Sequence, residues 1–460
     1  MKSLYILVAT VLILSTFCIL PTTSYAQNIS AGANHVLTIC VDGTVMAWGS
    51  SDYGQLGNGS SNDSEVPVAI PVNLLTGVSS VVAGADHSLV LLNDGSVRSF
   101  GGNSYGELGN DSNSDSNVPV EPFELSEIIA LAANYHSLAL KSDGTIYSFG
   151  EGGSGQLGDG TNSDNAYPNQ IPSFTGVTAI AAGDYFSLAV KNDGSVWAWG
   201  NNLLGQLGVG TNISSNEPLQ IESFSNAIAV AGGGSFSLAL KSDGTVWSWG
   251  RNSSGQLGNG NNTDSNFPVQ VSNLTGIIAI SAGGRHGVAI KNDGTVWTWG
   301  GNLFNQLGNG NANDSNVPVQ VSDLTGAVAI DAGVNFTTVA LKNDGTVWTW
   351  GTGYLGDIEV NNSSVPIQVN GLCEVIASTN DISTPMGSHV FPNPFENTLT
   401  VIEKNASGDV FIMDMLGNVV VWQRLSHGNN LINTAHISSG FYWMTVTQGN
   451  KKEIIKLVKQ

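Results

Sequence analysis

A serine flanked by glycines is the first residue in this sequence whose type and spacing could do chemistry. Residues 102–106 read Gly-Asn-Ser-Tyr-Gly, which matches the G-x-S-x-G pattern of a serine nucleophile. That chemistry needs a strand-to-helix turn that exposes the hydroxyl, with a histidine and an acid in reach. Related segments elsewhere in the chain read RNSSG and NNLLG, and no helical pattern follows any of them. We therefore expect an ordinary loop at Ser104.

Four histidines at one repeated position are the second candidate, because imidazole is a common metal ligand. They are His35, His87, His136 and His286. Three further copies of the same segment carry Phe186, Phe236 and Phe336 instead. A position that accepts phenylalanine favours buried packing over metal binding.

Loops rich in asparagine and aspartate are the third candidate. Residues 159–168 (DGTNSDNAYP) and 259–268 (NGNNTDSNFP) crowd oxygen atoms as calcium sites do. Tight turns use the same residues, because their side chains hydrogen-bond the nearby backbone. The loops lack the fixed ligand spacing of a calcium motif, so we expect turns, with neither a metal nor a cofactor.

The elements that carry these residues repeat along the chain. The dipeptide Asp-Gly, typical of a tight hairpin, recurs seven times and is followed each time by an aromatic-Gly pair. The seven aspartates are Asp42, Asp94, Asp143, Asp193, Asp243, Asp293 and Asp344. Each unit of about 50 residues contains short runs of β-branched and aromatic residues, broken by Gly, Asn and Asp, and repeats of this length indicate a propeller or solenoid. Four short strands per unit predict an all-β fold, a seven-bladed β-propeller; a β-solenoid is the alternative, but its repeats are usually shorter.

One repeat pattern also supports a resemblance. The consensus AG-x-x-H-S-L-A-L-K-x-D-G-T-V-W-x-W-G-x-N-x-x-G-Q-L-G-x-G resembles the repeat of the regulator of chromosome condensation family, whose fold is a seven-bladed propeller. The resemblance extends from about Ile29 to Ile376. The best-known member of that family is an exchange factor for a nuclear GTPase. We do not expect a nuclear GTPase as partner here, because the chain carries an export signal and its repeats have no insertion large enough to act on one.

The N-terminus has the pattern of a signal peptide. Lys2 precedes an apolar run from Leu4 to Leu20, and Ser24-Tyr25-Ala26 places small residues at the two positions that a signal peptidase reads. We predict cleavage after Ala26. A membrane anchor is the weaker interpretation, because polar sequence with proline follows the run and no other segment is apolar enough to span.

The C-terminus has a different pattern. The segments FPNPFENTLTV (Phe391–Val401), VFIMDMLGNVVV (Val410–Val421), ISSGFYWMTV (Ile437–Val446) and KKEIIKLVKQ are similar to the C-terminal sorting domain of type IX secretion. The resemblance implies a small β-sandwich that the outer-membrane translocon reads and that is usually removed afterwards; an adhesion module is the alternative. We expect a signal peptide over residues 1–26, the propeller over 27–378, a linker over 379–389 and the sorting domain over 390–460.

The charge of the chain limits the kinds of partner that it can bind. Residues 27–375 carry 8 Lys and Arg against 30 Asp and Glu, and the whole chain has a net charge of −21. So acidic a surface repels phosphate backbones, so we expect no nucleic-acid binding. Cationic partners remain open, as does a role in solubility alone.

Variation between repeats indicates where recognition could occur. In each unit the loop after Ala-Gly and the loop after Trp-Gly should open on one face of the disc, with the Asp-Gly turns on the other. The Asp-Gly side is nearly constant, and in five units a lysine lies two residues from the aspartate, namely Lys141, Lys191, Lys241, Lys291 and Lys342. The variable loops expose Tyr, Arg and Phe among Gly and Asn, a composition typical of recognition surfaces; aromatic side chains folded back on neighbouring loops are the alternative. The predicted binding face comprises Asn34, Tyr53, Asp86, Tyr105, Tyr135, Tyr185, Leu204, Arg251, Arg285, Phe304, Asn335 and Tyr354.

These observations predict an exported, monomeric, non-enzymatic propeller that binds a protein or glycan partner. It should be secreted or attached to the outer-membrane surface. The rival hypothesis is an extracellular lyase or hydrolase with its site on the same face. An enzyme should gather carboxylates, Tyr or His at one pocket, whereas a binding protein should spread aromatic residues over several blades.

Two cysteines predict how the ring closes. After removal of the signal peptide only Cys40 and Cys373 remain, in an oxidising compartment. Alignment of the repeats places Cys40 at the position of Lys342 and Cys373 at the position of Thr325. The first unit lacks most of its own first strand, which the C-terminal segment can supply. This pairing would bring the two cysteines within disulfide reach, so we predict a Cys40–Cys373 disulfide; two unrelated half-buried thiols are the alternative.

Overall fold

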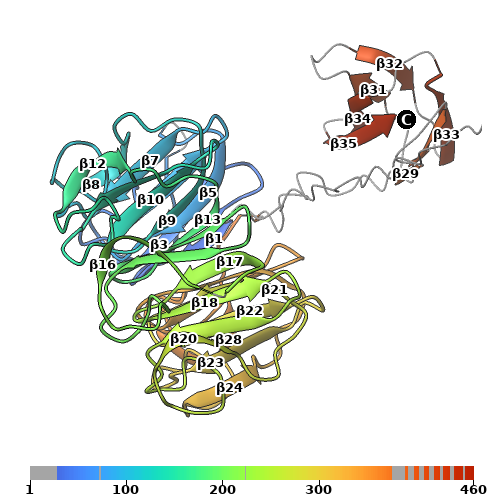
Figure 1. Cartoon of the computed structure of the whole chain (residues 1–460). Coiled ribbons are helices and arrows are strands. Elements are labelled where there is room, and N and C mark those ends of the chain that lie inside the picture. The colour runs from blue at the N-terminus through green and yellow to red at the C-terminus, as the bar shows by residue number, and fades with distance from the viewer. Residues whose placement is uncertain are drawn as a thin grey trace, which may run out of the picture.

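The computed structural model shown in Figure 1 describes most of the chain. It covers residues 28–375 apart from 72–73, 223 and 374. In the C-terminal part it covers 389–391, 398–403, 409–413, 419–424, 428–435, 440–448 and 451–459. The expected signal peptide lies outside the described residues, as does the expected linker apart from His389. No helix in the described part is long and apolar enough to cross a membrane.

The first part of the chain forms seven four-stranded antiparallel sheets, each built from strands consecutive in sequence. Blade 1 comprises β1 (Ile29–Ala31), β2 (His35–Ile39), β3 (Val45–Gly49) and β4 (Ser64–Ala69). Blade 2 comprises β5 (Val78–Ala83), β6 (His87–Leu92), β7 (Val97–Gly101) and β8 (Ser116–Val120). Blade 3 comprises β9 (Ile128–Ala133), β10 (His136–Lys141), β11 (Ile146–Gly150) and β12 (Asn165–Gln170). Blade 4 comprises β13 (Val177–Ala182), β14 (Phe186–Lys191), β15 (Val196–Gly200) and β16 (Ser215–Gln220).

The remaining blades repeat this order and complete the ring in Figure 1. Blade 5 comprises β17 (Ala227–Gly232), β18 (Phe236–Lys241), β19 (Val246–Gly250) and β20 (Ser265–Gln270). Blade 6 comprises β21 (Ile277–Ala282), β22 (His286–Lys291), β23 (Val296–Gly300) and β24 (Ser315–Gln320). Blade 7 comprises β25 (Ala327–Ala332), β26 (Thr337–Lys342), β27 (Val347–Thr352) and β28 (Asn362–Gln368). The predicted seven-bladed β-propeller is confirmed.

The core of the propeller lies between neighbouring blades. The third strand of each blade carries a completely buried aromatic residue, and these are Trp48, Phe100, Phe149, Trp199, Trp249, Trp299 and Trp350. Trp249 of blade 5, for example, packs among the apolar residues of blade 4, and its indole Nε1 donates to the Gln206 carbonyl at 2.9 Å. Trp199, Trp299 and Trp350 make the same bond, so these tryptophans contribute a large apolar area while their one polar atom stays bonded, whereas the buried Nε1 of Trp48 has no partner among the described residues.

The glycine of the Gln-Leu-Gly turn allows this packing. Gly208 adopts a φ of +70°, and a Cβ added there would lie 2.7 Å from the Trp249 ring. Both the left-handed backbone and the close approach of the ring require glycine at this position.

The two ends of the propeller meet in blade 1. β1 pairs with β2 through Ile29–Thr38 and the two pairs that follow, and Val375 forms an isolated antiparallel bridge with Cys40. Val375 thus stands where Ala327, opposite Lys342, begins the inner strand of blade 7. The C-terminal segment supplies the first residue of the inner strand of blade 1, as the alignment predicts. A disulfide joins Cys40 to Cys373, whose Cα atoms are 5.8 Å apart.

The C-terminal part forms two antiparallel sheets. One has the order β29 (His389–Phe391), β30 (Thr398–Glu403), β33 (Gly428–Asn433), and the other β32 (Val419–Arg424), β31 (Asp409–Met413), β34 (Gly440–Gln448), β35 (Lys451–Lys459). Val410 and Ile412 of one sheet and Ile432 of the other are completely buried. The small all-β domain agrees with the predicted β-sandwich.

Candidate functional site

The two variable loops of each blade lie on one end of the disc. The loop between the first and second strands accepts a backbone hydrogen bond from the loop after the third strand. Examples are Gly102 N to Asp86 O at 2.7 Å, and Gly301 N to Arg285 O at 2.8 Å. We call this end the variable face, and the opposite end, with the Asp-Gly turns, the Asp-Gly face.

Buried asparagines hold the longer of the two loops rigid. In blade 5 the Asn252 Nδ2 donates to the Asn261 and Thr263 carbonyls, and its Oδ1 accepts from Leu257 N at 2.9 Å. Asn252 is fully buried. The asparagine of the Trp-Gly-x-Asn pattern therefore fixes the loop backbone, and only the side chains that point outward differ between blades.

Two tyrosines of adjacent blades form an aromatic pair on the variable face. The Tyr135 and Tyr185 rings of blades 3 and 4 are parallel, with an interplanar angle of 1° and centroids 5.1 Å apart. Tyr185 is 37% exposed, and the neighbouring Tyr53 and Tyr105 are 45% and 44% exposed. The structure thus brings four of the predicted residues to the accessible surface of blades 1–4.

A second aromatic pair corrects the sequence alignment of blade 7. Thr337, and not Phe336, lies opposite Gly351 at the position that His286 takes opposite Gly300. An extra residue in the loop causes the shift, and Phe336 takes a positive φ of 78°. Its ring therefore reaches the variable face and stacks on Phe304, with centroids 4.3 Å apart.

The other predicted residues differ in accessibility. Arg285 is exposed, while Asp86, Leu204 and Arg251 are half-buried, and Arg251 Nε bonds the Ser253 hydroxyl at 3.0 Å. Three members, Asn34, Asn335 and Tyr354, instead connect blades 7 and 1. Asn335 donates to Asn34 Oδ1 at 3.2 Å, and the Tyr354 hydroxyl donates to Asp63. The Tyr354 side chain is therefore folded back on a neighbouring loop, which was the alternative to an exposed recognition residue.

Three apolar residues of this face were missed by the sequence reasoning. Leu203 and Leu303 are 69% and 72% exposed, and Ile213 is 73% exposed. Ile213 belongs to the same loop of blade 4 as Leu203, where the Asn212 amide bonds the Leu203 carbonyl at 3.1 Å. The sequence did contain a signal for the two leucines: they stand at the position where other blades have the polar residues Asp52, Ser104 and Ser253.

Carboxyl groups of blades 2–4 gather beside the tyrosine pair. Burial raises the pKa of Asp184 to about 7 and the pKa of Glu107 to about 7, with Glu151 and Asp115 adding repulsion at Glu107. Burial, followed by the charges of Asp184, Asp86 and Glu151 among others, raises the pKa of Tyr135 to about 12. This sector therefore carries negative charge that the described residues do not neutralise.

Glu107 provides a direct test of that charge. Other blades have glutamine here: Gln206 Oε1 accepts from Leu204 N at 3.0 Å, as Glu107 accepts from Tyr105 N at 2.9 Å. Because the folded pKa is raised, the unfolded chain loses its proton first, and stability falls as pH rises from the usual glutamate pKa to about 7. We expect Glu107→Gln to stabilise the protein at pH 8 by about 1–3 kcal/mol, roughly 1–4 °C in melting temperature.

Thermal unfolding at pH 8 and pH 5 measures this effect, and the gain should be smaller at pH 5. Glu217→Gln is the matched control, because Glu217 is exposed on the outer strand β16. An equal gain at both pH values for Glu107→Gln would contradict a raised carboxyl pKa.

The four histidines connect blades. His87 Nε2 lies 2.8 Å from the Ser137 hydroxyl of the next blade, and Ser137 donates to the Glu107 carbonyl at 2.9 Å. Because the serine proton is already used in the bond to this carbonyl, the histidine must donate through Nε2 and the serine oxygen accepts. His35, His136 and His286 make the same bond to Ser88, Ser187 and Thr338. Burial lowers the pKa of His136 to about 3, so the rings are neutral packing groups.

The serine and acidic-loop candidates lie in turns. Ser104 belongs to the loop between β7 and β8, as expected. In the 159–168 loop, Asp159 accepts from Thr161 N and Oγ1 at 2.9 and 2.8 Å, and Asp164 accepts from Gly152 N at 2.9 Å. These carboxylates serve turns, and the described residues contain no cluster of three or more His, Cys, Asp or Glu placed to hold a metal.

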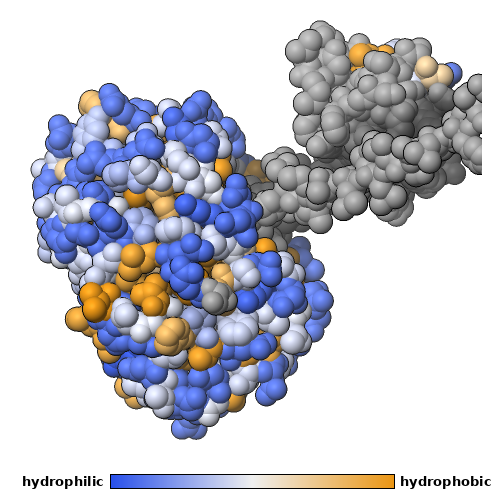
Figure 2. All heavy atoms as spheres, viewed as in Figure 1, coloured by the Kyte–Doolittle hydropathy of each residue, from blue (hydrophilic) through white to orange (hydrophobic). Residues whose placement is uncertain are grey.

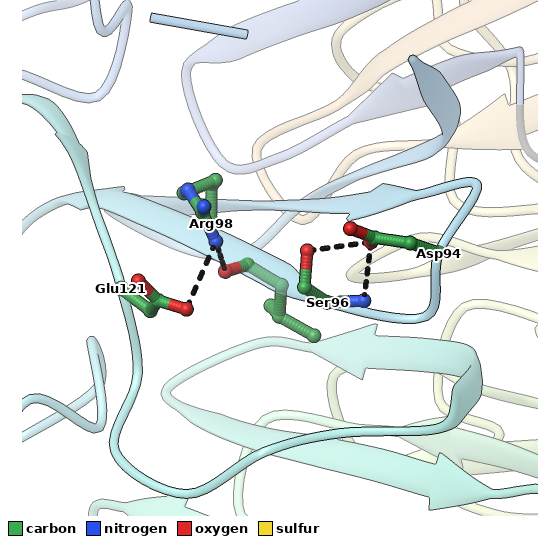
Figure 3. Close-up of polar contacts among 5 residues, drawn as sticks. Asp94, Ser96, Arg98 and Glu121 are labelled. Carbon is green, nitrogen blue, oxygen red and sulfur yellow. Dashed lines mark hydrogen bonds and ion pairs between the residues drawn. The ribbon is translucent and has the colours of Figure 1, made fainter. Parts of the chain in front are cut away.

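The Asp-Gly face uses its polar groups internally. Figure 3 shows blade 2, where Asp94 accepts from Ser96 N and Oγ at 2.9 and 2.7 Å, and Arg98 pairs with Glu121 at 3.5 Å. The expected pairing of lysine with the nearby aspartate occurs for Lys342 and Asp344, at 3.1 Å. Lys191 and Lys241 instead lie over the rings of Trp197 and Trp247, at 4.4 and 4.6 Å.

Comparison with known proteins fits this geometry. The fold and its two faces define a β-propeller built of repeats, and residues 23–339 match the family model of the RCC1-like domain. The chain belongs to this family. Residues 389–460 match the secretion system C-terminal sorting domain, which implies type IX secretion and an extracellular or cell-surface location.

Individual curated relatives match only part of this chain. The chain is 35% identical over 104 residues to the probable E3 ubiquitin-protein ligase HERC4 of Homo sapiens, covering 22% of this chain and 9% of that protein. It is 36% identical over 93 residues to the ultraviolet-B receptor UVR8 of Arabidopsis thaliana, covering 20% and 21%. The chain thus spans a small fraction of the length of these relatives.

Solved structures show the same fold. Human WBSCR16 superposes with a TM-score of 0.59 and 28% identity over 67% of this chain and 85% of that chain. Prp20p of Saccharomyces cerevisiae gives a TM-score of 0.64 at 22% identity over 80% and 89%.

Proposed function

We propose that this secreted propeller is a non-enzymatic, monomeric binding protein whose variable face recognises a protein or glycan partner outside the cell. The observation that carries the proposal is the contrast between the two faces. Tyr53, Tyr105, Leu203 and Leu303 are exposed on the variable face, whereas the tryptophans of the Asp-Gly face lie under lysines or over their own turns. Exposed aromatic and apolar side chains on a rigid frame are the usual anchors of an interface.

The domains have separate roles in this proposal. The signal peptide of residues 1–26 directs the chain into the periplasm, and the sorting domain of residues 390–460 engages the type IX translocon. The propeller of residues 27–378 alone faces the partner. A nuclear GTPase is no candidate, because an exported chain does not meet it, and the acidic propeller disfavours nucleic acid.

An extracellular lyase or hydrolase is the second candidate, and one observation favours it. Glu107 and Glu151 interact electrostatically, and hydrolysis of glycosides uses a pair of carboxyls with one raised pKa. A lyase that removes a proton through tyrosine needs a lowered tyrosine pKa, whereas that of Tyr135 is raised to about 12. The negative sector would also repel acidic sugars. Binding accounts better for residues spread over several blades.

A combined substitution tests the binding face. Replacing Tyr135, Tyr185, Arg285 and Phe304 with alanine should reduce partner binding by at least about 100-fold, since a few anchors carry most interface energy. Their exposed or half-buried positions predict a melting temperature within a few degrees of the parent protein. The secreted protein is applied to a glycan array and to surface-protein extracts, and the ligands it retains are re-measured with the variant.

A matched control separates this face from the rest of the surface. Phe267 is 60% exposed and Val317 36% exposed, and both lie on the outer strands of blades 5 and 6. Alanine at these two positions should leave binding unchanged. Retained affinity of the fourfold variant, or a large loss of its stability, would assign the four residues to structure instead. Turnover of array glycans by the parent protein would support the enzyme.

A further inference from the structure

One polar cluster lies where the variable face meets the central channel of the ring. The channel has a volume of about 340 Å³ and is lined by small residues of the inner strands, with Asn134 among them. Asn134 Nδ2 donates to Asp184 Oδ1 of the next blade at 3.2 Å. These two residues directly precede Tyr135 and Tyr185, so the tyrosine pair stands beside them.

The cluster is restricted to blades 3 and 4. The equivalent residues of blades 5 and 6 are Gly234 and Gly284, and a Cβ added at Gly234 would lie 2.5 Å from the Gly284 carbonyl oxygen and 3.2 Å from Asp184 Oδ2. Side chains are thus excluded from the adjoining part of the rim. The Asp184 carboxylate lies against this closely packed glycine backbone, and the residue remains half-buried.

The cluster also has an unmet capacity to accept hydrogen bonds. Asn134 is 4% exposed, and its Oδ1 has no hydrogen-bond partner among the described residues. A buried carbonyl without a donor is unfavourable, and a ligand that donates a hydrogen bond there would remove that penalty. Asp184 Oδ1 receives a bond from Asn134, and the described ion pairs, Arg98–Glu121, Lys141–Glu127 and Lys342–Asp344, leave Asp184 unpaired.

The surroundings favour positive charge. The Tyr135 and Tyr185 rings are parallel at 5.1 Å, and their faces attract cations electrostatically. Asp86 and Glu151 add negative charge, because both raise the pKa of Tyr135. The nearby His136 stays neutral, since burial lowers its pKa to about 3. The two arginines of the variable face, Arg251 of the adjoining blade 5 and Arg285 of blade 6, are not among the groups that shift the pKa of Asp184.

From this arrangement we infer that Asn134, Asp184, Tyr135 and Tyr185 form a pocket for the side-chain ammonium group of a lysine in a protein partner. The inference rests on the proposed function and names the chemistry of its partner. An ammonium group has three donors and no acceptor, which suits two adjacent oxygen acceptors and an aromatic wall. Exposed Tyr105 and Leu203 on the flanking loops offer contact area for the polypeptide around that lysine.

The pocket is tested by measuring the binding of pentalysine to the secreted protein by calorimetry at low salt. Pentalysine should bind, and the same peptide with every side chain acetylated should bind at least tenfold more weakly, because acetylation removes the charge. Free butylamine should bind much more weakly than the peptide if flanking contacts contribute. Since Asp184 ionises near pH 7, affinity should increase from pH 5.5 to pH 8.

Two variants make the test specific. Asp184→Asn keeps the shape and should lower pentalysine affinity at least tenfold while leaving stability unchanged or higher, because burial penalises the charged carboxylate. Glu217→Gln removes one exposed charge from the outer strand of blade 4 and should change affinity less than twofold. Asp184→Gly, which copies blades 5 and 6, replaces Asp184→Asn if the latter does not fold.

The outcomes separate this inference from the proposed function. Equal losses in Asp184→Asn and Glu217→Gln, or equal binding of the acetylated peptide, would overturn the lysine pocket and leave only nonspecific attraction to an acidic surface. A partner that is lost with the fourfold variant but kept by Asp184→Asn would sustain the binding face and refute the pocket.

Discussion

Deletion of residues 390–460 is expected to abolish delivery of the propeller to the cell surface and the medium. Residues 389–460 match the secretion system C-terminal sorting domain, which implies type IX secretion, so their loss should block export. The propeller has its own inter-blade cores, built from residues between 29 and 375, so the truncated protein should fold. It should therefore accumulate in the periplasm as a soluble protein, which immunoblots of medium, surface and periplasmic fractions would detect.

Transfer of the tail provides the control. The last 72 residues of the chain, fused to a periplasmic reporter enzyme, should carry that reporter out of the cell, and intact mass of the exported parent protein should lack the tail. Unchanged extracellular levels after the deletion would refute the sorting function and favour the adhesion module. Export of the reporter with the tail still attached would refute only its removal.

Repeats made most of the fold predictable from sequence. The Asp-Gly turns and aromatic-Gly pairs occur in every unit. With four short strands per unit, few folds other than a propeller can bury the aromatic residues of these pairs. The closure could also be predicted, since aligning Cys373 with Thr325 placed Cys373 near Cys40, and the structure joins the two while Val375 pairs with Cys40. The error arose where a unit departs from the period. One extra residue before Thr337 moves Phe336 from a core position to the surface.

The chemistry of the variable face could be predicted less well, because it depends on contacts between blades. Residue type singled out Tyr135 and Tyr185 separately, but their stacking follows from the angle between blades 3 and 4. Asn134 and Asp184 are 50 residues apart in sequence and meet only when the ring closes. The raised pKa of Glu107 comes from burial, which a single glutamate among five glutamines did not indicate.

The structure joins the ends of the ring by hydrogen bonds as well as by the disulfide. Asp331 of blade 7 accepts bonds from Ser30 Oγ and Ala31 N of blade 1, both at 2.9 Å, and from Ser281 Oγ of blade 6 at 2.8 Å. One carboxylate thus holds three blades around the channel. Burial raises the pKa of Asp331 while these bonds lower it. Contacts of this kind should keep the reduced protein folded at moderate temperature.

The disulfide should nevertheless contribute strongly to stability. Cys40 and Cys373 are separated by 333 positions, and closing so long a loop stabilises by about 4–6 kcal/mol in the chain-entropy model. Replacing both cysteines with serine should therefore lower the melting temperature of the propeller by roughly 5–8 °C. The same fall should follow reduction of the parent protein, and reductant should have no effect on the double variant.

Peptide mapping of the secreted protein without reductant tests the bond itself. Because Cys18 lies within the predicted signal peptide, the mature chain should contain only Cys40 and Cys373, and a single cross-linked peptide pair is expected. Reduction should leave the strand signal in circular dichroism intact at 25 °C, since Asp331 and the inter-blade cores still close the ring. Two free, alkylatable thiols in the exported protein would refute the disulfide, and complete unfolding on reduction would show that the hydrogen bonds of Asp331 do not suffice to hold blades 1 and 7 together.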